Sequence, residues 1–340
     1  MPVDSPAGAD DLDHDHSAEH FISTGALPPD ERASALVEDA HERFRDNQEG
    51  ALSDVYPALL RVAPEQFGIC VVSTRGTSHD AGDVDIEFSI MSVAKPFVFA
   101  LVCDTLGPGV IRRRVGVDAT GLPFNSLSAV EQSGDGRTNP MVNPGAIATT
   151  SLVPGDDADA KWSFIRDGLS RFAGRELSLD DEIYTSASAT NFRNQAIGDL
   201  LHAYGRLVTD VPTTLDLYTR QSSMRVTARD LAVMGATLAD GGVNPITGER
   251  VVDAATSRFT LTVMTTAGLY ETSGTWLYDI GLPGKSGIGG GIVTVSPGKG
   301  GLGTFAPLLD PAGNSVKGQL TARFLSRRLG LDLFMSAPAG

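Results

Sequence analysis

The sequence predicts an α/β (α+β) fold in which strands from both ends of the chain share one sheet and a helical segment is inserted between them. Two apolar runs near the beginning, "FGICVVST" and "DVDIEFSI", have the length and composition of strands. Two more, "GGGIVTVSP" and "GLGTFAPLL", lie near the end. Apolar residues between these pairs recur at helical spacing, and 340 residues suffice for one or two closely packed domains.

The elements are expected in the following order. Residues 1–27 are acidic and lack a hydrophobic period, which predicts a disordered tail. A helix begins in "PPDERASALVEDAHERFRDN", which has proline and acidic residues in its first turn. The first two strands form a hairpin joined by "RGTSHDAG", residues 92–106 form a buried helix, and the segment 107–145 forms ordered loops. Further helices are expected at 145–153, 159–173, 190–204, 212–220, 227–240 and 254–267, followed by the C-terminal strands and a last helix in "NSVKGQLTARFLSRRLG".

These elements predict a single domain over residues 28–330. Its sheet part comprises residues 28–90 together with 280–330, and its helical part comprises residues 91–279. Residues 331–340 are expected to form a second tail.

The charge and the apolar pattern restrict the partners. A net charge of −15 opposes nucleic-acid binding, which depends on clustered Lys and Arg. No run approaches the ~18 apolar residues of a membrane helix, and the N-terminus is acidic where a signal peptide would be basic. Cys70 and Cys103 lie in apolar runs, which predicts buried free thiols suited to a reducing compartment. We therefore expect a cytoplasmic protein with no nucleic-acid and no membrane partner.

The stretch "EFSIMSVAKPFVFA" contains a serine and a lysine three residues apart. Ser92 and Lys95 share one face if a helix starts there, and Pro96 is acceptable only near such a start. A helix N-terminus supplies free N–H groups for an oxyanion, and an apolar setting lowers the pKa of a lysine so that it can act as a base. The alternative is a helix cap followed by a surface lysine.

A second motif, "GLPGKSGIGGGI", favours the catalytic interpretation. Lys285, Ser286 and Gly287 precede a predicted strand, as does the K-[ST]-G element that accompanies S-x-x-K in penicillin-recognising serine enzymes. A phosphate-binding loop is excluded, because Asp279 stands where its leading glycine is required. A dinucleotide-binding fingerprint is excluded by Ile292.

From roughly residue 28 to 328 the chain resembles the serine-dependent glutaminase family. The resemblance is carried by the two motifs and by "QFGICVVS", "VGVDATGLPFNS", "NPMVNPGAIATTSLV", "RNQAIGDLL", "VTARDLAVMGATLADGGVNPITGERVV", "GLYETSG" and "GNSVKG". It implies a β-lactamase/penicillin-binding-protein-like fold, with a central antiparallel sheet flanked by helices and an inserted helical subdomain.

The resemblance also implies a reaction. Ser92 attacks the side-chain amide of glutamine with Lys95 as its base, ammonia leaves an acyl-enzyme, and water releases glutamate. Tyr270 is expected to pass a proton to the leaving amine, and Tyr218 to join the hydrogen-bond network of the site.

The resemblance assigns further residues to binding. Asn143 and Asn194 match residues that hold the substrate, and Lys285 and Ser286 are expected beside them. The backbone N–H of Ile288, with that of Ser92, would form the oxyanion hole. No metal or organic cofactor is expected: serine chemistry needs none, and the "DHDHSAEH" cluster has no compact metal-site spacing. The family implies a homodimer or homotetramer.

Three positions depart from the family pattern. Met91 stands where the family has Gln, Ala187 where a carboxylate meets the substrate α-amino group, and Val55 where "Y-I-P" places a tyrosine, with Tyr56 one residue late. An ammonium without its carboxylate loses a hydrogen bond worth ~1.5–3 kcal/mol. The expected substrate is therefore glutamine or a glutamine-like amide, one that lacks a free α-amine or is larger and more apolar. Two alternatives stay open: a serine acyltransferase or cyclase, and a non-catalytic homologue that binds a small molecule or a protein.

Overall fold

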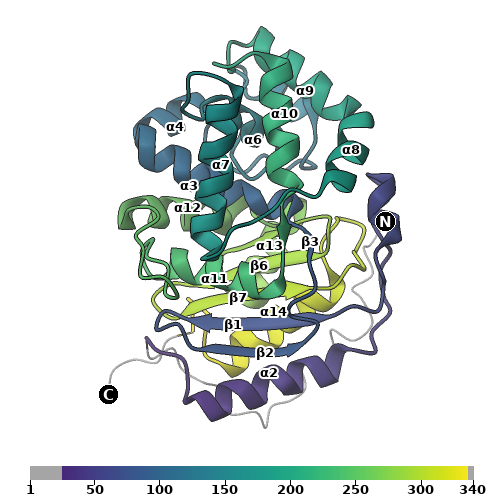
Figure 1. The fold of residues 1–340 in the computed structure, drawn as a ribbon, viewed down its shortest axis with the longest axis vertical. Coiled ribbons are helices and arrows are strands. Elements are labelled where there is room, and N and C mark those ends of the chain that lie inside the picture. The colour runs from purple at the N-terminus through teal and green to yellow at the C-terminus, as the bar shows by residue number, and fades with distance from the viewer. Residues whose placement is uncertain (1–24, 336–340) are drawn as a thin grey trace.

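The computed structural model describes residues 25–335, and their main sheet is antiparallel (Figure 1). Its strand order is β2-β1-β7-β6-β5. The central pair joins the two ends of the sequence, because Cys70 of β1 lies opposite Gly303 of β7. This arrangement confirms the predicted fold class. The strands are β1 (Gly68–Ser73), β2 (Ser78–Gly82), β5 (Gly284–Ser286), β6 (Gly291–Ser296) and β7 (Gly300–Phe305).

Two helices cover one face of the sheet. The helices α2 (Asp30–Phe44) and α14 (Val316–Arg328) pack against each other, with α2 below the strands in Figure 1 and α14 behind them. The buried residues of α2 recur every three or four positions, so the helix presents one apolar stripe. That stripe packs with Leu325 of α14 and with Ile69 and Leu302 of the strands in one apolar core.

The opposite face is covered by α11 (Ala228–Ala239), which packs very closely on β7. Its first turn is fixed by a capping box, in which the Asp230 N–H donates to Thr227 Oγ1 and the Thr227 N–H donates to the Asp230 carboxylate. Gly303 leaves room for this helix: a Cβ there would lie 2.1 Å from the Ala228 carbonyl oxygen.

Gly303→Ala is therefore expected to lower the free energy of unfolding by about 2–3 kcal/mol, because the strand and the helix backbone must separate. The melting temperature should fall by several degrees. Gly274→Ala is the matched control, because no atom lies within 4 Å of a Cβ at Gly274. Equal melting temperatures for the two variants would contradict the close packing.

A layer of helices lies above α11 in Figure 1, around the buried helix α3 (Ala94–Leu106). Phe97 of α3 packs against Phe172, with ring centroids 5.0 Å apart. The other members are α4 (Pro108–Arg114), α5 (Leu127–Gln132), α6 (Asn143–Ser151), α7 (Ala158–Ala173), α8 (Asp181–Ala189), α9 (Phe192–Ala203), α10 (Val211–Ser222), α12 (Ala254–Ala267) and α13 (Ser273–Ile280), with short 3-10 turns η1 (Pro57–Arg61), η2 (Met91–Val93) and η3 (Tyr270–Thr272).

The predicted hairpin is wrong in its second strand. The backbone turns back at once through Gly76, which has φ +82°, and β2 forms inside "RGTSHDAG". "DVDIEFSI" contributes only β3 (Phe88–Ser89), which pairs with β4 (Arg225–Val226) in a separate two-stranded sheet. The alternation of apolar and polar residues in "DVDIEFSI" therefore does not mark a strand with one buried face: Ile86 is 39% exposed, whereas Phe88 is buried.

The remaining differences concern short helices and the strand β5, which contains Lys285 and Ser286 where no strand was predicted. The segment 107–145, expected to be loops, contains α4 and α5, and neither α8 nor α13 was predicted. The long helices α7, α9, α10, α11 and α12 lie within a few residues of their predicted ranges.

The division into a sheet part and a helical part stays a prediction. The helix α11 lies in the range expected for the helical part but packs on the sheet. Leu331, in the range expected for the second tail, is buried in the core with α14, and residues 1–24 and 336–340 lie outside the described residues.

Within residues 25–335, no single helix is long and apolar enough to cross a membrane. Taken together, α3 with η2 and α4 reach the necessary length and composition, but they meet at a bend of 117°.

Candidate active site

Ser92 lies at a sharp turn between β3 and α3. Met91, directly before it, has φ +48°, a left-handed conformation that costs an ordinary residue about 1–2 kcal/mol. Ser92 then falls in the 3-10 turn η2, which continues into α3. Pro96 is the third residue of α3, where its missing N–H breaks no intrahelical bond. The helix therefore starts where the serine motif predicts.

Lys95 reaches back to the serine. Its Nζ lies 2.6 Å from Ser92 Oγ, and the side chain is 2% exposed. Burial lowers the pKa of Lys95 to about 7, because the charged form has lost its water. An amine that is substantially neutral near pH 7 can accept the hydroxyl proton of the serine.

A series of hydrogen-bonded asparagines continues from the lysine. Asn143, the first residue of α6, accepts from Lys95 Nζ at 2.9 Å and from the Tyr218 hydroxyl at 3.1 Å. Its amide donates to Asn194 Oδ1 at 2.8 Å, and the Asn194 amide donates to Asn191 Oδ1 at 2.6 Å. Because a lysine donates to its oxygen, the orientation of the Asn143 amide is fixed.

Tyr270 and Lys285 form the other side of the site. Tyr270, like Met91, is left-handed, with φ +57°. Its hydroxyl and Lys285 Nζ both donate to the Ser286 carbonyl, at 3.0 and 2.6 Å, and Nζ lies 4.3 Å from the centre of the tyrosine ring. Burial, with a smaller effect from Lys95, lowers the pKa of Lys285 well below its usual range. Burial raises the pKa values of Tyr270 and Tyr218, so both phenols keep their protons at neutral pH.

Gly287 lets the end of β5 approach the serine backbone. A Cβ at Gly287 would lie 2.9 Å from the Ile90 carbonyl oxygen and 3.3 Å from the Ser92 nitrogen. The next N–H group belongs to Ile288, which makes no hydrogen bond within residues 25–335. Its amide can therefore donate to a ligand.

A catalytic pocket of about 80 Å³ lies at Ser92. The pocket is small, so it can hold a short substrate side chain beside Ser92. Most of the residues expected at the site do line it; they are Val55, Tyr56, Met91, Ser92, Asn143, Asn194, Tyr218 and Ile288. Four other residues expected at the site are buried and do not line the pocket; they are Lys95, Tyr270, Lys285 and Ser286.

Ala187 is buried on α8 and does not line this pocket. It stands one helical turn before Thr190 and Asn191, which do. Six lining residues were not predicted from the sequence: Phe124, Asn125, Thr190, Asn191, Arg193 and Ser222. Three of them lie in "TNFRN" around Asn194, so that stretch could have indicated them.

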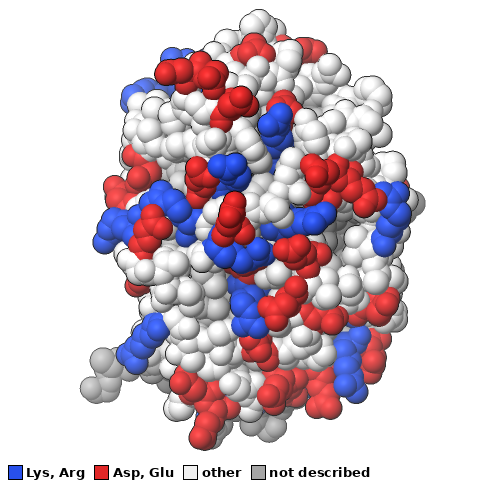
Figure 2. All heavy atoms as spheres, viewed as in Figure 1, with Lys and Arg blue, Asp and Glu red and all other residues white. Residues whose placement is uncertain are grey.

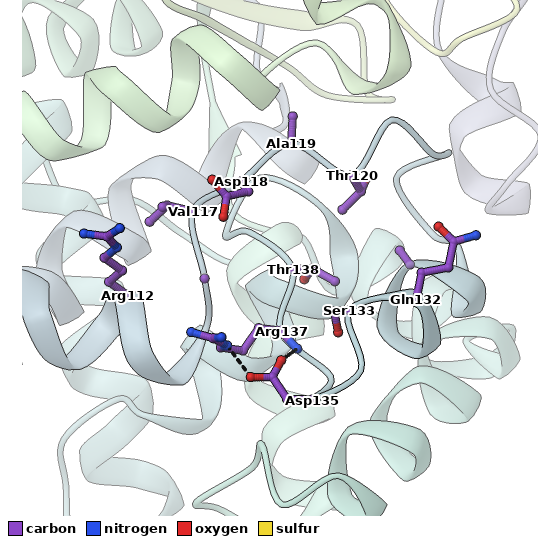
Figure 3. Close-up of a pocket in the computed structure, with 12 residues that line it drawn as sticks. Arg112, Val117, Asp118, Ala119, Thr120, Gln132, Ser133, Asp135, Arg137 and Thr138 are labelled. Atoms are coloured by element: carbon purple, nitrogen blue, oxygen red, sulfur yellow. Dashed lines mark hydrogen bonds and ion pairs between the residues drawn. The ribbon is translucent and has the colours of Figure 1, made fainter.

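A much larger hollow, of about 510 Å³, contains none of the expected site residues (Figure 3). It lies between α4, the loop at Asp118 and α5, and its floor carries an ion pair in which Arg137 Nε donates to Asp135 at 2.6 Å. Its size therefore does not identify the reacting centre.

On the face drawn in Figure 2, Lys and Arg are interspersed with Asp and Glu. Residues 25–335 hold no group of three His, Cys, Asp or Glu side chains placed to bind a metal. His14, His16 and His20 lie outside these residues.

The chain is similar to known proteins. Residues 50–334 match the family model of glutaminases. The chain belongs to the glutaminase family. It is 66% identical to "Glutaminase 2" of Yersinia pestis over 318 residues, which cover 94% of each protein. It is 44% identical to a glutaminase of Colwellia psychrerythraea over 300 residues, 88% of this chain and 96% of that one.

Solved glutaminase structures share the fold. "Probable glutaminase ybaS" superposes with a TM-score of 0.89 at 40% identity, covering 90% of this chain and 99% of that one. The protein Mglu "in its glutamate form" superposes with a TM-score of 0.86 at 34% identity, covering 90% and 71%. The sheet and its helices therefore have the β-lactamase-like arrangement of the glutaminases.

Proposed function

We propose that this glutaminase-family protein hydrolyses the side-chain amide of glutamine, or of a glutamine-like amide, to the carboxylate and ammonia through an acyl-serine intermediate. One observation carries the proposal: the Nζ of a buried lysine, whose pKa is lowered to about 7, lies 2.6 Å from Ser92 Oγ. The relatives named above are glutaminases.

Acylation starts at Ser92. Its Oγ attacks the amide carbon while Lys95 accepts the hydroxyl proton. The amide oxygen becomes an oxyanion, for which the N–H groups of Ser92 and Ile288 are the proposed donors. Tyr270, whose raised pKa keeps it protonated, gives its proton to the leaving nitrogen; the C–N bond then breaks and ammonia departs.

Deacylation uses the same groups. Before it starts, the proton that Lys95 took from Ser92 passes to the Tyr270 phenolate, so that both groups regain their starting protonation states. The neutral Lys95 then takes a proton from water, the water oxygen attacks the acyl carbon, and the C–O bond to Ser92 breaks as Lys95 returns the proton to the serine. We assign the carboxamide to Asn143 and Asn194; the hydrogen bond between these two residues, and the one that Tyr218 donates to Asn143, support this assignment. Lys285 holds the Ser286 carbonyl beside the Tyr270 ring.

Ammonia release tests the proposal. The wild-type protein should release ammonia and glutamate in equal amounts from glutamine or from α-amine-blocked glutamines. A wild-type protein that is folded but inactive on every one of these amides would overturn the proposed function.

The rate should depend on the protonation of Lys95. Only the neutral amine can accept the serine proton, so kcat/KM should rise with pH, reach half its maximum near the lysine pKa of about 7, and then level off. Initial rates between about pH 5 and 9 check this prediction. A profile that is flat or falls through pH 7 would contradict the role of Lys95.

Ala187→Glu should raise kcat/KM for free glutamine about tenfold, because the new carboxylate would stand one helical turn before Asn191, which lines the pocket, and would pair with the substrate ammonium. Ala187→Gln, which has the same length without the charge, is the control. No gain with the glutamate variant would count against a missing carboxylate as the reason for weak recognition.

We also propose that the protein works in the cytoplasm as a homodimer or homotetramer. The resemblance to the family supports the oligomer. Cys70 and Cys103 are free and buried, which suits a reducing compartment.

A further inference from the structure

The lining of the catalytic pocket offers no carboxylate to pair with an ammonium group. None of its fourteen lining residues is Asp or Glu, and its one charged residue is Arg193. The Arg193 Nε donates to the Asn125 carbonyl at 2.9 Å, and its side chain is exposed at the mouth. A substrate carboxylate can therefore be paired there, whereas a free α-ammonium would lose water and gain no opposite charge.

A second hollow, which we name the annex, continues from this pocket. The annex has a volume of about 520 Å³ and shares Val55, Phe124 and Ile288 with the catalytic pocket. The two hollows meet at these shared residues, so a substrate group that extends beyond the catalytic pocket can enter the annex.

The walls of the annex are mostly apolar. Eight of its thirteen lining residues have apolar side chains, among them Leu52, Leu309 and Pro311. Asp310 also lines it, and three donors hold its carboxylate in place: Oδ1 accepts from the N–H groups of Ala312 and Asn314, and Oδ2 accepts from Gln319. The remaining acid, Asp54, is exposed.

We propose that the preferred substrate is a glutamine whose α-nitrogen carries an apolar acyl group, and that the annex binds this group while Arg193 faces the α-carboxylate. This inference rests on the proposed function. Acylation removes the α-ammonium that the pocket cannot pair, and it supplies apolar surface for the annex, worth about 0.8 kcal/mol for each buried CH₂. The reaction follows the same two steps as with glutamine. Ser92 displaces ammonia from the side-chain carboxamide, and water then releases an Nα-acyl-glutamate from the acyl-serine.

The test compares ammonia release from glutamine, Nα-acetyl-glutamine and Nα-hexanoyl-glutamine. We expect kcat/KM to rise from glutamine to the acetyl and then the hexanoyl compound, by about tenfold or more in total. Ala312→Trp, which fills the annex, should remove most of this gain and leave glutamine turnover unchanged, because Ala312 does not line the catalytic pocket. Leu52→Ser makes the wall of the annex less apolar without adding bulk, and it should also reduce the gain in kcat/KM. This second variant keeps the test valid if the tryptophan variant does not fold.

Three results would overturn the inference while leaving the proposed function intact. Free glutamine could be the best substrate of the series. The hexanoyl rate could be unchanged in both annex variants. Asp54→Asn could lower kcat/KM for free glutamine about tenfold, which would show that Asp54 pairs the ammonium. Absence of ammonia from every compound would instead overturn the proposed function.

Discussion

Ser92→Ala is expected to lower kcat for amide hydrolysis by a factor on the order of 10⁴ to 10⁶, the range seen when the nucleophile of a serine hydrolase is removed. The substitution deletes the hydroxyl oxygen that lies within reach of Lys95 Nζ and forms the acyl bond. The Asn143 and Asn194 contacts do not involve Ser92, so binding should persist. Single-turnover ammonia release by the purified variant, followed over hours, measures the loss.

Ser222→Ala is the matched control. Ser222 also lines the catalytic pocket, but its hydroxyl donates to the Tyr218 carbonyl within α10. Its replacement should change kcat little. Residual Ser92→Ala activity within about tenfold of the wild type would refute the acyl-serine mechanism.

Lys95→Met is expected to lower kcat by a factor on the order of 10² to 10⁴, the usual contribution of a positioned general base. The methionine side chain is about as long as that of lysine but has no amine, so it fills the same buried space and cannot accept a proton. Measuring kcat at pH 8, where the wild-type amine is mostly neutral, shows the loss at its greatest.

The same variant should be more stable than the wild type near pH 7. The pKa of Lys95 is about 7 in the folded protein against 10.5 for an ordinary lysine, so the unfolded protein binds a proton that the folded protein does not. Protonation therefore favours unfolding, and the stability of the wild type rises as pH increases from about 7 to 10.5. Lys95→Met removes this contribution, which chemical denaturation at several pH values detects. A variant that loses both activity and stability would indicate a structural role for Lys95.

The sequence predicted the fold class because its strongest signals are local. The long helices α7, α11 and α12 have clear apolar periods bounded by caps and turn residues, and the C-terminal strands alternate with glycine-rich turns. The second strand of the hairpin was predicted in the wrong place because "SHDAG" has little strand propensity. It becomes β2 only by pairing with the buried strand β1.

The candidate site likewise contains residues that a local motif predicts and residues that only the fold brings together. Ser92 and Lys95 could be predicted because two residues of fixed type and spacing must meet at a helix start. Asn191, Phe124 and Arg193 carry no such signature, since their place at the pocket follows from long-range packing of α5, α8 and α9. The position of Ala187 behind the wall likewise depends on how α8 is oriented.

The acyl-enzyme is the central claim, and peptide mass spectrometry after a rapid acid quench tests it most directly. Wild-type protein mixed with excess glutamine or Nα-hexanoyl-glutamine should yield a peptide containing Ser92 that is heavier by the corresponding γ-acyl group. The adduct should be absent from Ser92→Ala and should decay at the rate of turnover. Ammonia release at full rate with no adduct on Ser92, or with the adduct on another residue, would contradict the mechanism.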